Sequence, residues 1–196
     1  MDTSAPSCGG PVAIRLWHAL RERASQAAAR HARRLEQDGR AAAIRWLAWG
    51  AALAPSFGQV HRDLVAARRR AGDDRLGALA LARKFVRRFE HAADAWITLG
   101  DALTAAFRPD DALAAYERAL SLEERPDAAM AAGDLYSRAG DHATAGARYA
   151  RAYAAGAGPD ALRANARALR RAGDIEAAQR AVELWEKETG LRWADD

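Results

Sequence analysis

The chain has few of the residues from which disulfide frameworks and metal centres are built. Cys8 is its single cysteine, which excludes a disulfide within the chain and a cysteine-based metal site. The five histidines include no pair at i, i+4 and no HExxH sequence; they are His18, His31, His61, His91 and His142. The sequence therefore predicts no bound metal.

Long apolar runs are also absent. No stretch approaches the roughly 18 consecutive apolar residues that a membrane-spanning helix needs. The first residues, MDTSAPSCGG, lack the apolar run of a secretion or lipid-attachment signal, and we expect residues 1–10 to form a flexible tail. These features favour a cytoplasmic protein that does not span a membrane.

Lysine is almost missing, since Lys84 and Lys187 are the only two, and arginine supplies nearly all of the positive charge. The net charge is +4, but the arginines alternate with aspartate and glutamate along the chain. This mixture favours solvated helix faces over a nucleic-acid-binding surface. Binding to nucleic acid or to an anionic membrane surface through the arginine-rich faces is the alternative.

No group of residues forms a catalytic constellation. There is no glycine-rich phosphate loop and no nucleophile with a base beside it. The acidic pairs Asp73-Asp74 and Asp110-Asp111 stand at expected helix starts, where carboxylates cap the backbone and interact favourably with the helix dipole. We therefore predict no catalytic residue, no cofactor and no enzymatic activity.

The residues that are abundant favour helices. Alanine supplies much of the apolar content and β-branched residues are few, so the local preference is helical almost throughout. Gly-Asp pairs and prolines separate segments of roughly 11–15 residues with helical periodicity. An amphipathic helix is expected at residues 11–24, with Leu16, Trp17 and Leu20 on one side.

Several residue classes recur every 33 residues, which is the spacing from Gly100 to Gly133. The recurring sets are Asp94, Asp127 and Asp160; Gly100, Gly133 and Ala166; Ala112, Ala145 and Ala178; Tyr116, Tyr149 and Val182; and Ala119, Ala152 and Trp185. Recurrence of many classes at one interval indicates an array of structural repeats, because each unit must bury its apolar face against its neighbours.

These positions resemble the tetratricopeptide repeat. In one unit six signature positions match, namely Trp96, Leu99, Gly100, Ala112, Tyr116 and Ala119. The resemblance implies an all-α fold, a right-handed α-solenoid of about five helical hairpins that follows the N-terminal amphipathic helix. The hairpins are expected at 25–57, 58–92, 93–125, 126–158 and 159–191, where 25–92 holds two degenerate units and 93–191 three repeats; a C-terminal tail follows at 192–196.

Two details of this array lead to further expectations. Trp185 stands where the family prefers alanine, a departure that suits a terminal unit whose last helix faces a cap. Within the second hairpin, four apolar side chains are expected in the core: Leu64, Leu76, Leu79 and Phe85.

The resemblance implies a protein–protein interaction module, such as an adaptor, assembly scaffold or chaperone-like factor, with self-association as an additional capacity. In this family the first helix of each hairpin lines a concave groove that binds a partner peptide or helix. Carried over, the groove residues are Asp94, Ile97, Asp101, Asp127, Met130, Asp134, Arg163, Arg167 and Arg170. We expect Asp101 and Asp134 to face basic or polar residues of the partner; the alternative is that these charges are only solvated.

An aromatic cluster is expected on the second helix of the first hairpin, where Trp46, Trp49 and Leu53 follow one another at i, i+3 and i+7. We expect Leu16 and Trp17 of the N-terminal helix to cover it from within the chain. The alternative is an exposed docking patch formed by Trp17, Trp46 and Trp49, which suits a partner or a membrane surface.

Overall fold

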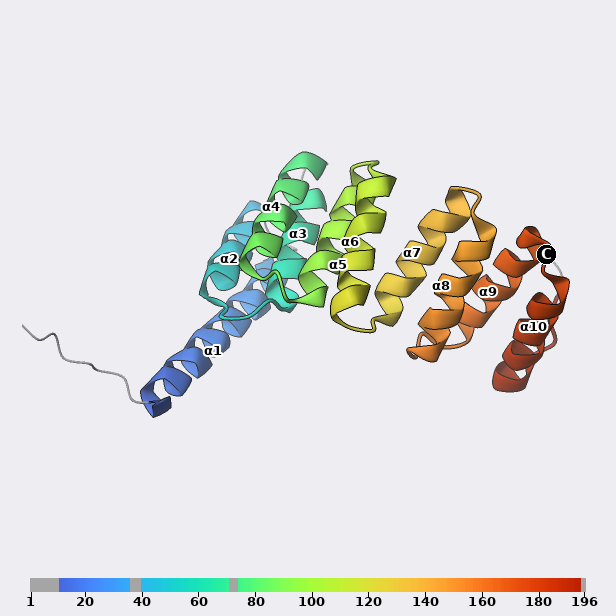
Figure 1. Ribbon diagram of the computed structural model, residues 1–196. Helices are drawn as coiled ribbons and strands as arrows, with labels where there is room; N and C mark the ends of the chain where they lie inside the picture. Colours follow the sequence, from blue (N-terminus) through green and yellow to red (C-terminus); the bar gives the residue numbers. More distant parts are fainter. Residues whose placement is uncertain (1–10, 36–39, 71–73, 195–196) are drawn as a thin grey trace, which may run out of the picture. The chain divides into compact units, whose positions relative to one another are not determined.

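The structure is a computed structural model that describes residues 11–35, 40–70 and 74–194 (Figure 1). Over these ranges the chain forms helices and no strands. The helices are α1 (Pro11–Leu35), α2 (Arg40–Leu53), α3 (Gln59–Arg70), α4 (Arg75–Arg88), α5 (Ala93–Ala105), α6 (Pro109–Leu122), α7 (Pro126–Arg138), α8 (His142–Ala154), α9 (Pro159–Ala172) and α10 (Ile175–Thr189). The predictions made for residues 1–10, including Cys8, lie outside the described residues.

The chain divides into two compact units, one up to Phe85 and one from Val86 onward. In the first unit α1 packs against α2 and α3, and α2 packs against α3. In the second unit each helix from α5 to α10 packs against the next along the chain. This succession of helical hairpins is the α-solenoid fold class that the repeat predicted. Among the described helices, none is both long and apolar enough to cross a membrane.

The prolines and Gly-Asp pairs that separate the helical segments favour helix starts through their own backbone and side-chain properties. Pro109, Pro126 and Pro159 are the first residues of α6, α7 and α9, where the fixed φ of proline suits the helix and its missing N–H costs nothing. Asp141 and Asp174 are the N-caps of α8 and α10, and each carboxylate accepts a hydrogen bond from the backbone N–H three residues on, at 3.1 and 3.0 Å.

The repeated glycines and tyrosines pack against each other within one hairpin. The ring of Tyr116 lies on Gly100, where an added Cβ would be 2.5 Å from ring carbon Cε1. The same relation recurs in the next hairpin, where a Cβ on Gly133 would be 2.6 Å from Cε1 of Tyr149. Since real Cβ contacts are never that short, the close approach of the two helices requires glycine at both positions.

At the N-terminus the predicted boundary is wrong. The helix expected at 11–24 does not end there, because α1 continues to Leu35 as one helix. The sequence between Arg23 and Leu35 is mostly alanine and arginine, without glycine or proline, so nothing in it interrupts the helix. The later part of α1 packs on α2 through small residues, which are Ser25, Ala28, Ala29 and Ala32.

Three of the four residues expected in the core of the second hairpin are buried: Leu64, Leu79 and Phe85. Leu76 is 77% exposed, so its assignment to the core was wrong. The buried face of α4 is centred between Ala78 and Leu79, and Leu76 points about 120° away from that centre.

His61 is fully buried and connects several elements of the first unit. The Gly58 backbone N–H donates to Nδ1 at 3.2 Å, so Nδ1 is the acceptor and Nε2–H donates to the Ala51 carbonyl at 3.1 Å. The ring also stacks on Phe57, with centroids 4.9 Å apart, and meets Phe85 edge-on at 4.7 Å. A side chain with no predicted role thus joins the end of α2, the following loop, α3 and α4.

The C-terminal residues expected as a tail are partly packed. Trp193 meets Trp185 of α10 edge-on, with ring centroids 5.4 Å apart, and its backbone N–H donates to Glu186 at 2.7 Å. The guanidinium of Arg170 lies 5.4 Å above the Trp193 ring. The segment that packs beside Trp185, where a cap was expected, is therefore the one that contains Trp193.

Candidate functional site

Two acidic side chains lie on one face of α5 and two on one face of α7. Asp94 and Asp101 are seven residues apart on α5, as are Asp127 and Asp134 on α7. Seven residues are nearly two helical turns, so each pair points to the same side of its helix. These four aspartates are the acidic part of the surface predicted to bind a partner.

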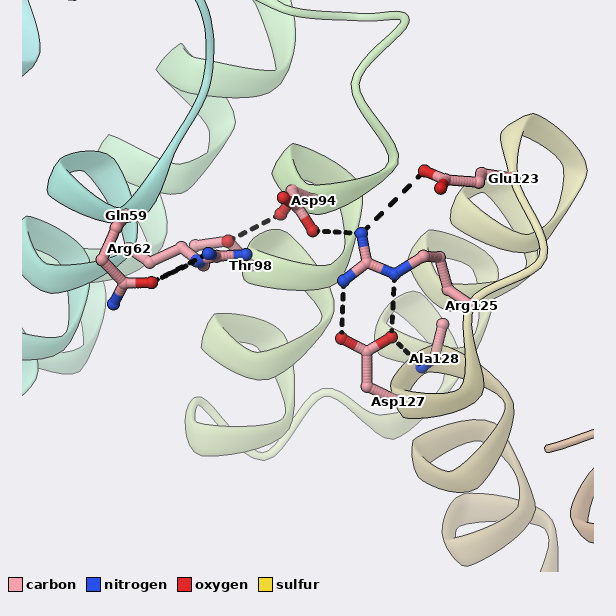
Figure 2. A network of polar contacts seen from close by, with 8 residues as sticks. All are labelled: Gln59, Arg62, Asp94, Thr98, Glu123, Arg125, Asp127 and Ala128. Atoms are coloured by element: carbon pink, nitrogen blue, oxygen red, sulfur yellow. Dashed lines mark hydrogen bonds and ion pairs between the residues drawn. The ribbon is translucent and has the colours of Figure 1, made fainter. Parts of the chain in front are cut away.

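The aspartates at the helix starts are held by Arg125 (Figure 2). Its Nη1 pairs with Asp94 Oδ1 at 2.5 Å and its Nη2 with Asp127 Oδ2 at 3.0 Å. Asp127 also accepts a hydrogen bond from the backbone N–H of Ala128. The two carboxylates predicted to contact a partner thus have an internal role, which is to join the starts of α5 and α7 through one guanidinium.

The other two aspartates are held by buried tyrosines. Tyr116 donates its phenol hydrogen to Asp101 at 2.7 Å, and Tyr149 donates to Asp134 at 2.7 Å. Burial, followed by the nearby Asp101 carboxylate, raises the pKa of Tyr116 well above its ordinary value of 10.0. Both tyrosines are therefore neutral hydrogen-bond donors at physiological pH, while both aspartates face solvent. The repeat orients the two carboxylates identically on adjacent hairpins.

The two apolar residues predicted for the groove contribute to the packing of the hairpins. Ile97 is only 8% exposed, because α5 is buried on nearly every side except the strip with Asp94 and Asp101. Met130 is partly buried and packs against the core cluster that contains Tyr149. The expectation that Ile97 contacts a partner is wrong, since packing buries its side chain, whereas Met130 keeps part of its surface exposed and its contact with a partner stays a prediction.

On α9 the charge of the surface changes sign. Arg167 is exposed and stands one repeat after Asp134, at the position equivalent to Asp101 and Asp134 in the two preceding hairpins. Arg163 is half-buried, and Arg170 lies over the ring of Trp193. The row of equivalent positions therefore reads carboxylate, carboxylate, guanidinium from α5 to α9.

A cavity of about 660 Å³ adjoins this row at the turn between α5 and α6 and the end of α7. Phe107, Leu113 and Tyr136 form much of its apolar wall, and Arg138 lies at its edge. Thr104 also lines the cavity, and its hydroxyl is close to the phenol of Tyr116, so the cavity is next to the Tyr116–Asp101 pair.

Phe107 has an unusual backbone conformation. Its φ is +58°, and it is the one non-glycine residue with positive φ in the described ranges. The equivalent positions in the next two hairpins are Gly140 and Gly173, with φ of +84° and +85°. The Phe107 side chain is 80% exposed, so burial does not compensate for the strain.

We expect Phe107→Gly to raise the free energy of unfolding by about 1 kcal/mol, because glycine adopts positive φ without a steric cost. Denaturant unfolding measures the change. Phe107→Ala is the matched control, since it removes the exposed ring and keeps the strained backbone. A glycine variant that is no more stable than the alanine variant would contradict the strain.

The three tryptophans of the first unit are exposed, at 61% for Trp17, 39% for Trp46 and 50% for Trp49. Trp46 meets His31 of α1 edge-on, with centroids 4.7 Å apart, and Trp49 at 5.7 Å. The expectation that Leu16 and Trp17 cover the pair was wrong. Trp17 precedes His31 by fourteen residues, so it lies about 21 Å away along α1.

Solved structures with a similar fold extend over most of the chain. MamA is 20% identical over 81% of this chain and 94% of its own, with a TM-score of 0.66. A thermophilic TPR protein of Thermus thermophilus is 18% identical over 85% of this chain and 92% of its own, with a TM-score of 0.62. YrrB, described as a TPR protein with an unusual peptide-binding site, is 16% identical over 83% and 85%, with a TM-score of 0.60.

The sequence model of the tetratricopeptide repeat family matches residues 93–125, which are the α5–α6 hairpin. Residues 93–125 are a tetratricopeptide repeat, and the chain has the fold of solved tetratricopeptide-repeat proteins. No curated protein has a matching sequence. At these identities the solved structures show the tetratricopeptide fold and leave the ligand to be inferred from the residues of this chain.

Two residues at the site, Arg125 and Phe107, were not predicted from the sequence. Arg125 directly precedes Pro126 in the turn between two helices. Nothing in the neighbouring sequence indicates that its side chain lies next to two aspartates. Phe107 did have a local signal in the sequence, because the following repeats have glycine at the equivalent position.

Within the described residues, no group of three or more His, Cys, Asp or Glu side chains is arranged to bind a metal ion.

Proposed function

We propose that the unit from Val86 onward binds a segment of a partner protein along the face that contains Asp101 and Asp134. The tetratricopeptide fold supports a protein–protein interaction module in general. The observation behind this specific proposal is the pair of tyrosine-held carboxylates at equivalent positions of adjacent hairpins. Their orientation is set before a partner arrives, which reduces the entropy lost on binding.

The charges define the chemistry of the segment. Each carboxylate accepts one hydrogen bond from its tyrosine, and because a carboxylate can accept several hydrogen bonds, it can also bind an arginine, lysine or backbone N–H of the partner. Arg167 at the next equivalent position favours an acidic residue there. We therefore propose a segment with two basic positions, one for each aspartate, and an acidic position opposite α9.

The cavity beside Thr104 and Phe107 extends the proposed site. Its walls are mainly apolar, and its volume of about 660 Å³ accommodates an aromatic or large aliphatic side chain. The strained backbone at Phe107 supports a role in binding, because strain of this kind persists where function requires it. YrrB, which has a similar fold, is described as having a peptide-binding site, and this too supports the proposal.

In this proposal the protein is a non-catalytic adaptor, assembly scaffold or chaperone-like factor that acts in the cytoplasm. The test is selection of peptides from a displayed random library, followed by affinity measurements with Asp101→Asn and Asp134→Asn combined. We expect the double variant to weaken binding of the selected peptides by about 10- to 100-fold, because two charge-assisted hydrogen bonds are lost.

The asparagine substitutions suit the test because the amide oxygen still accepts the tyrosine hydrogen bond, so the fold is retained. Glu176→Gln combined with Glu183→Gln is the matched control, since both side chains are exposed on α10 and the change in net charge is the same. Equal losses in the two double variants would show only a long-range charge effect, and undiminished binding by the aspartate variant would refute the proposed site. Salt-sensitive binding of any nucleic acid, regardless of sequence, would favour the arginine-based alternative.

A further inference from the structure

Exposed large apolar side chains are concentrated on the first two helices. Of the eleven in the described residues, six belong to α1 and α2. These six are Ile14, Leu16, Trp17, Leu20, Trp46 and Trp49. A concentration of this kind marks a surface for a further interaction, because each apolar group left in water has an unfavourable free energy.

On α1 the apolar side chains form one continuous stripe. Trp17, Leu20, Ala24 and His31 follow at helical spacing and lie within about 40° of a common direction. The His31 ring contacts Trp46 of α2, which extends the stripe onto the second helix. We call this surface, which consists of Leu16, Trp17, Leu20, His31, Trp46 and Trp49, the α1–α2 aromatic stripe.

The first part of α1 has none of the described helices of its unit opposite it. Arg21 Nε donates to the carbonyl of Leu53 at 3.0 Å, and Leu53 is the last residue of α2. Residues 14–20 therefore extend past the end of α2, as Figure 1 shows, and each of them is exposed. Among the described residues of the unit, none covers the apolar side chains of this part of the stripe.

The charges around the stripe are almost all positive. Between Ile14 and Arg34 the chain has six arginines and a single acidic residue, Glu22. Arg23 and Arg30 are exposed and flank the stripe, about 60–80° around the helix from Leu20. Glu22 points about 160° away, on the opposite side. The surface is thus an aromatic and aliphatic stripe bordered by guanidinium groups.

We propose that the α1–α2 aromatic stripe binds the surface of an anionic lipid bilayer, with α1 lying parallel to the membrane plane. The aromatic and aliphatic side chains enter the boundary between headgroups and acyl chains, and Arg23 and Arg30 contact lipid phosphates. Attachment is peripheral, since no described helix can cross a membrane. A second copy of the chain fits less well, because two facing stripes would bring the arginines of both copies together.

The test is co-sedimentation of the full chain with vesicles of phosphatidylcholine alone and of phosphatidylcholine mixed with phosphatidylglycerol. We expect binding to the anionic vesicles that weakens as salt is added. Trp17→Ser combined with Leu20→Ser should weaken it at least about tenfold. Arg23→Gln combined with Arg30→Gln should weaken it about fivefold per arginine, on the order of 30-fold together.

Both double variants change exposed residues, so their melting temperatures should match that of the unchanged protein. Leu76→Ser is the control, because Leu76 is more exposed than any side chain of the stripe and lies on α4. Vesicle binding that is absent, or that both double variants retain in full, would overturn the proposal. Self-association or capture of an acidic protein through Trp17 and Leu20, without vesicle binding, would overturn it as well.

Discussion

Tyr116→Ala is expected to lower the free energy of unfolding by about 3–5 kcal/mol. The side chain is 2% exposed, its ring lies on the backbone of Gly100, and its hydroxyl donates to Asp101. Alanine would leave a cavity between the two helices of the hairpin. Because Gly100 has no side chain of its own, nothing nearby can fill that cavity. Denaturant unfolding monitored by circular dichroism measures the loss.

Tyr116→Phe is the control that separates packing from hydrogen bonding. It keeps the ring and removes the hydroxyl, so we expect a loss of only about 1 kcal/mol, since the exposed Asp101 can bind water instead. Equal losses in the two variants would mean that the hydrogen bond, and not the packing, stabilises the hairpin.

The phenol of Tyr116 also makes the free energy of unfolding depend on pH. Its pKa is raised in the folded protein, so above the ordinary pKa of 10.0 the unfolded chain loses this proton first. The stability due to Tyr116 is therefore fully present below about pH 10 and is lost as the pH rises further. The phenylalanine variant should lose less stability than the unchanged protein over that range.

His61→Ala should have a comparable effect in the first unit, about 3–5 kcal/mol. The imidazole is fully buried, and both of its nitrogens are hydrogen bonded, one to the Gly58 N–H and the other to the Ala51 carbonyl. Alanine removes both bonds together with the ring contacts to Phe57 and Phe85. Urea unfolding is the appropriate measurement.

His18→Ala is the matched control for this substitution, because His18 is exposed on α1 and belongs to the same unit. We expect its free energy of unfolding to change by less than about 0.5 kcal/mol. If His61→Ala were equally mild, the imidazole would not be the structural connection between α2, α3 and α4 that its contacts indicate.

Part of the candidate site was predictable from the sequence. Asp101 and Asp134 were assigned to the groove because they stand at positions that line it in the tetratricopeptide family, and both are exposed. Their partners Tyr116 and Tyr149 were interpreted only as packing residues, although each lies fifteen residues after its aspartate in the same hairpin. Each tyrosine both packs between the helices and holds its aspartate, since the ring is buried while the hydroxyl reaches the surface.

Other features of the surface depended on contacts that no periodicity encodes. Asp94 pairs with Arg125, thirty-one residues away, in a turn whose course the sequence does not reveal. An isoleucine such as Ile97 can either contact a partner at the surface or pack in the core, and its residue type does not distinguish the two. The proposed groove is consequently less acidic than predicted, because the single positive charge of Arg125 offsets part of the negative charge of the two aspartates at the helix starts.

The sequence by itself determined the helical repeat, its constant interval and most helix starts in this protein, because these follow from residues near one another in the chain. Helix propensity, proline at the first turn and aspartate at the N-cap act locally and repeat visibly. The tertiary structure alone decided that Trp17 lies beyond α2, that His61 joins three helices and that the acidic side chains are held internally. Each of these depends on which residues meet after hairpins form and pack, and that pairing has no counterpart in local spacing.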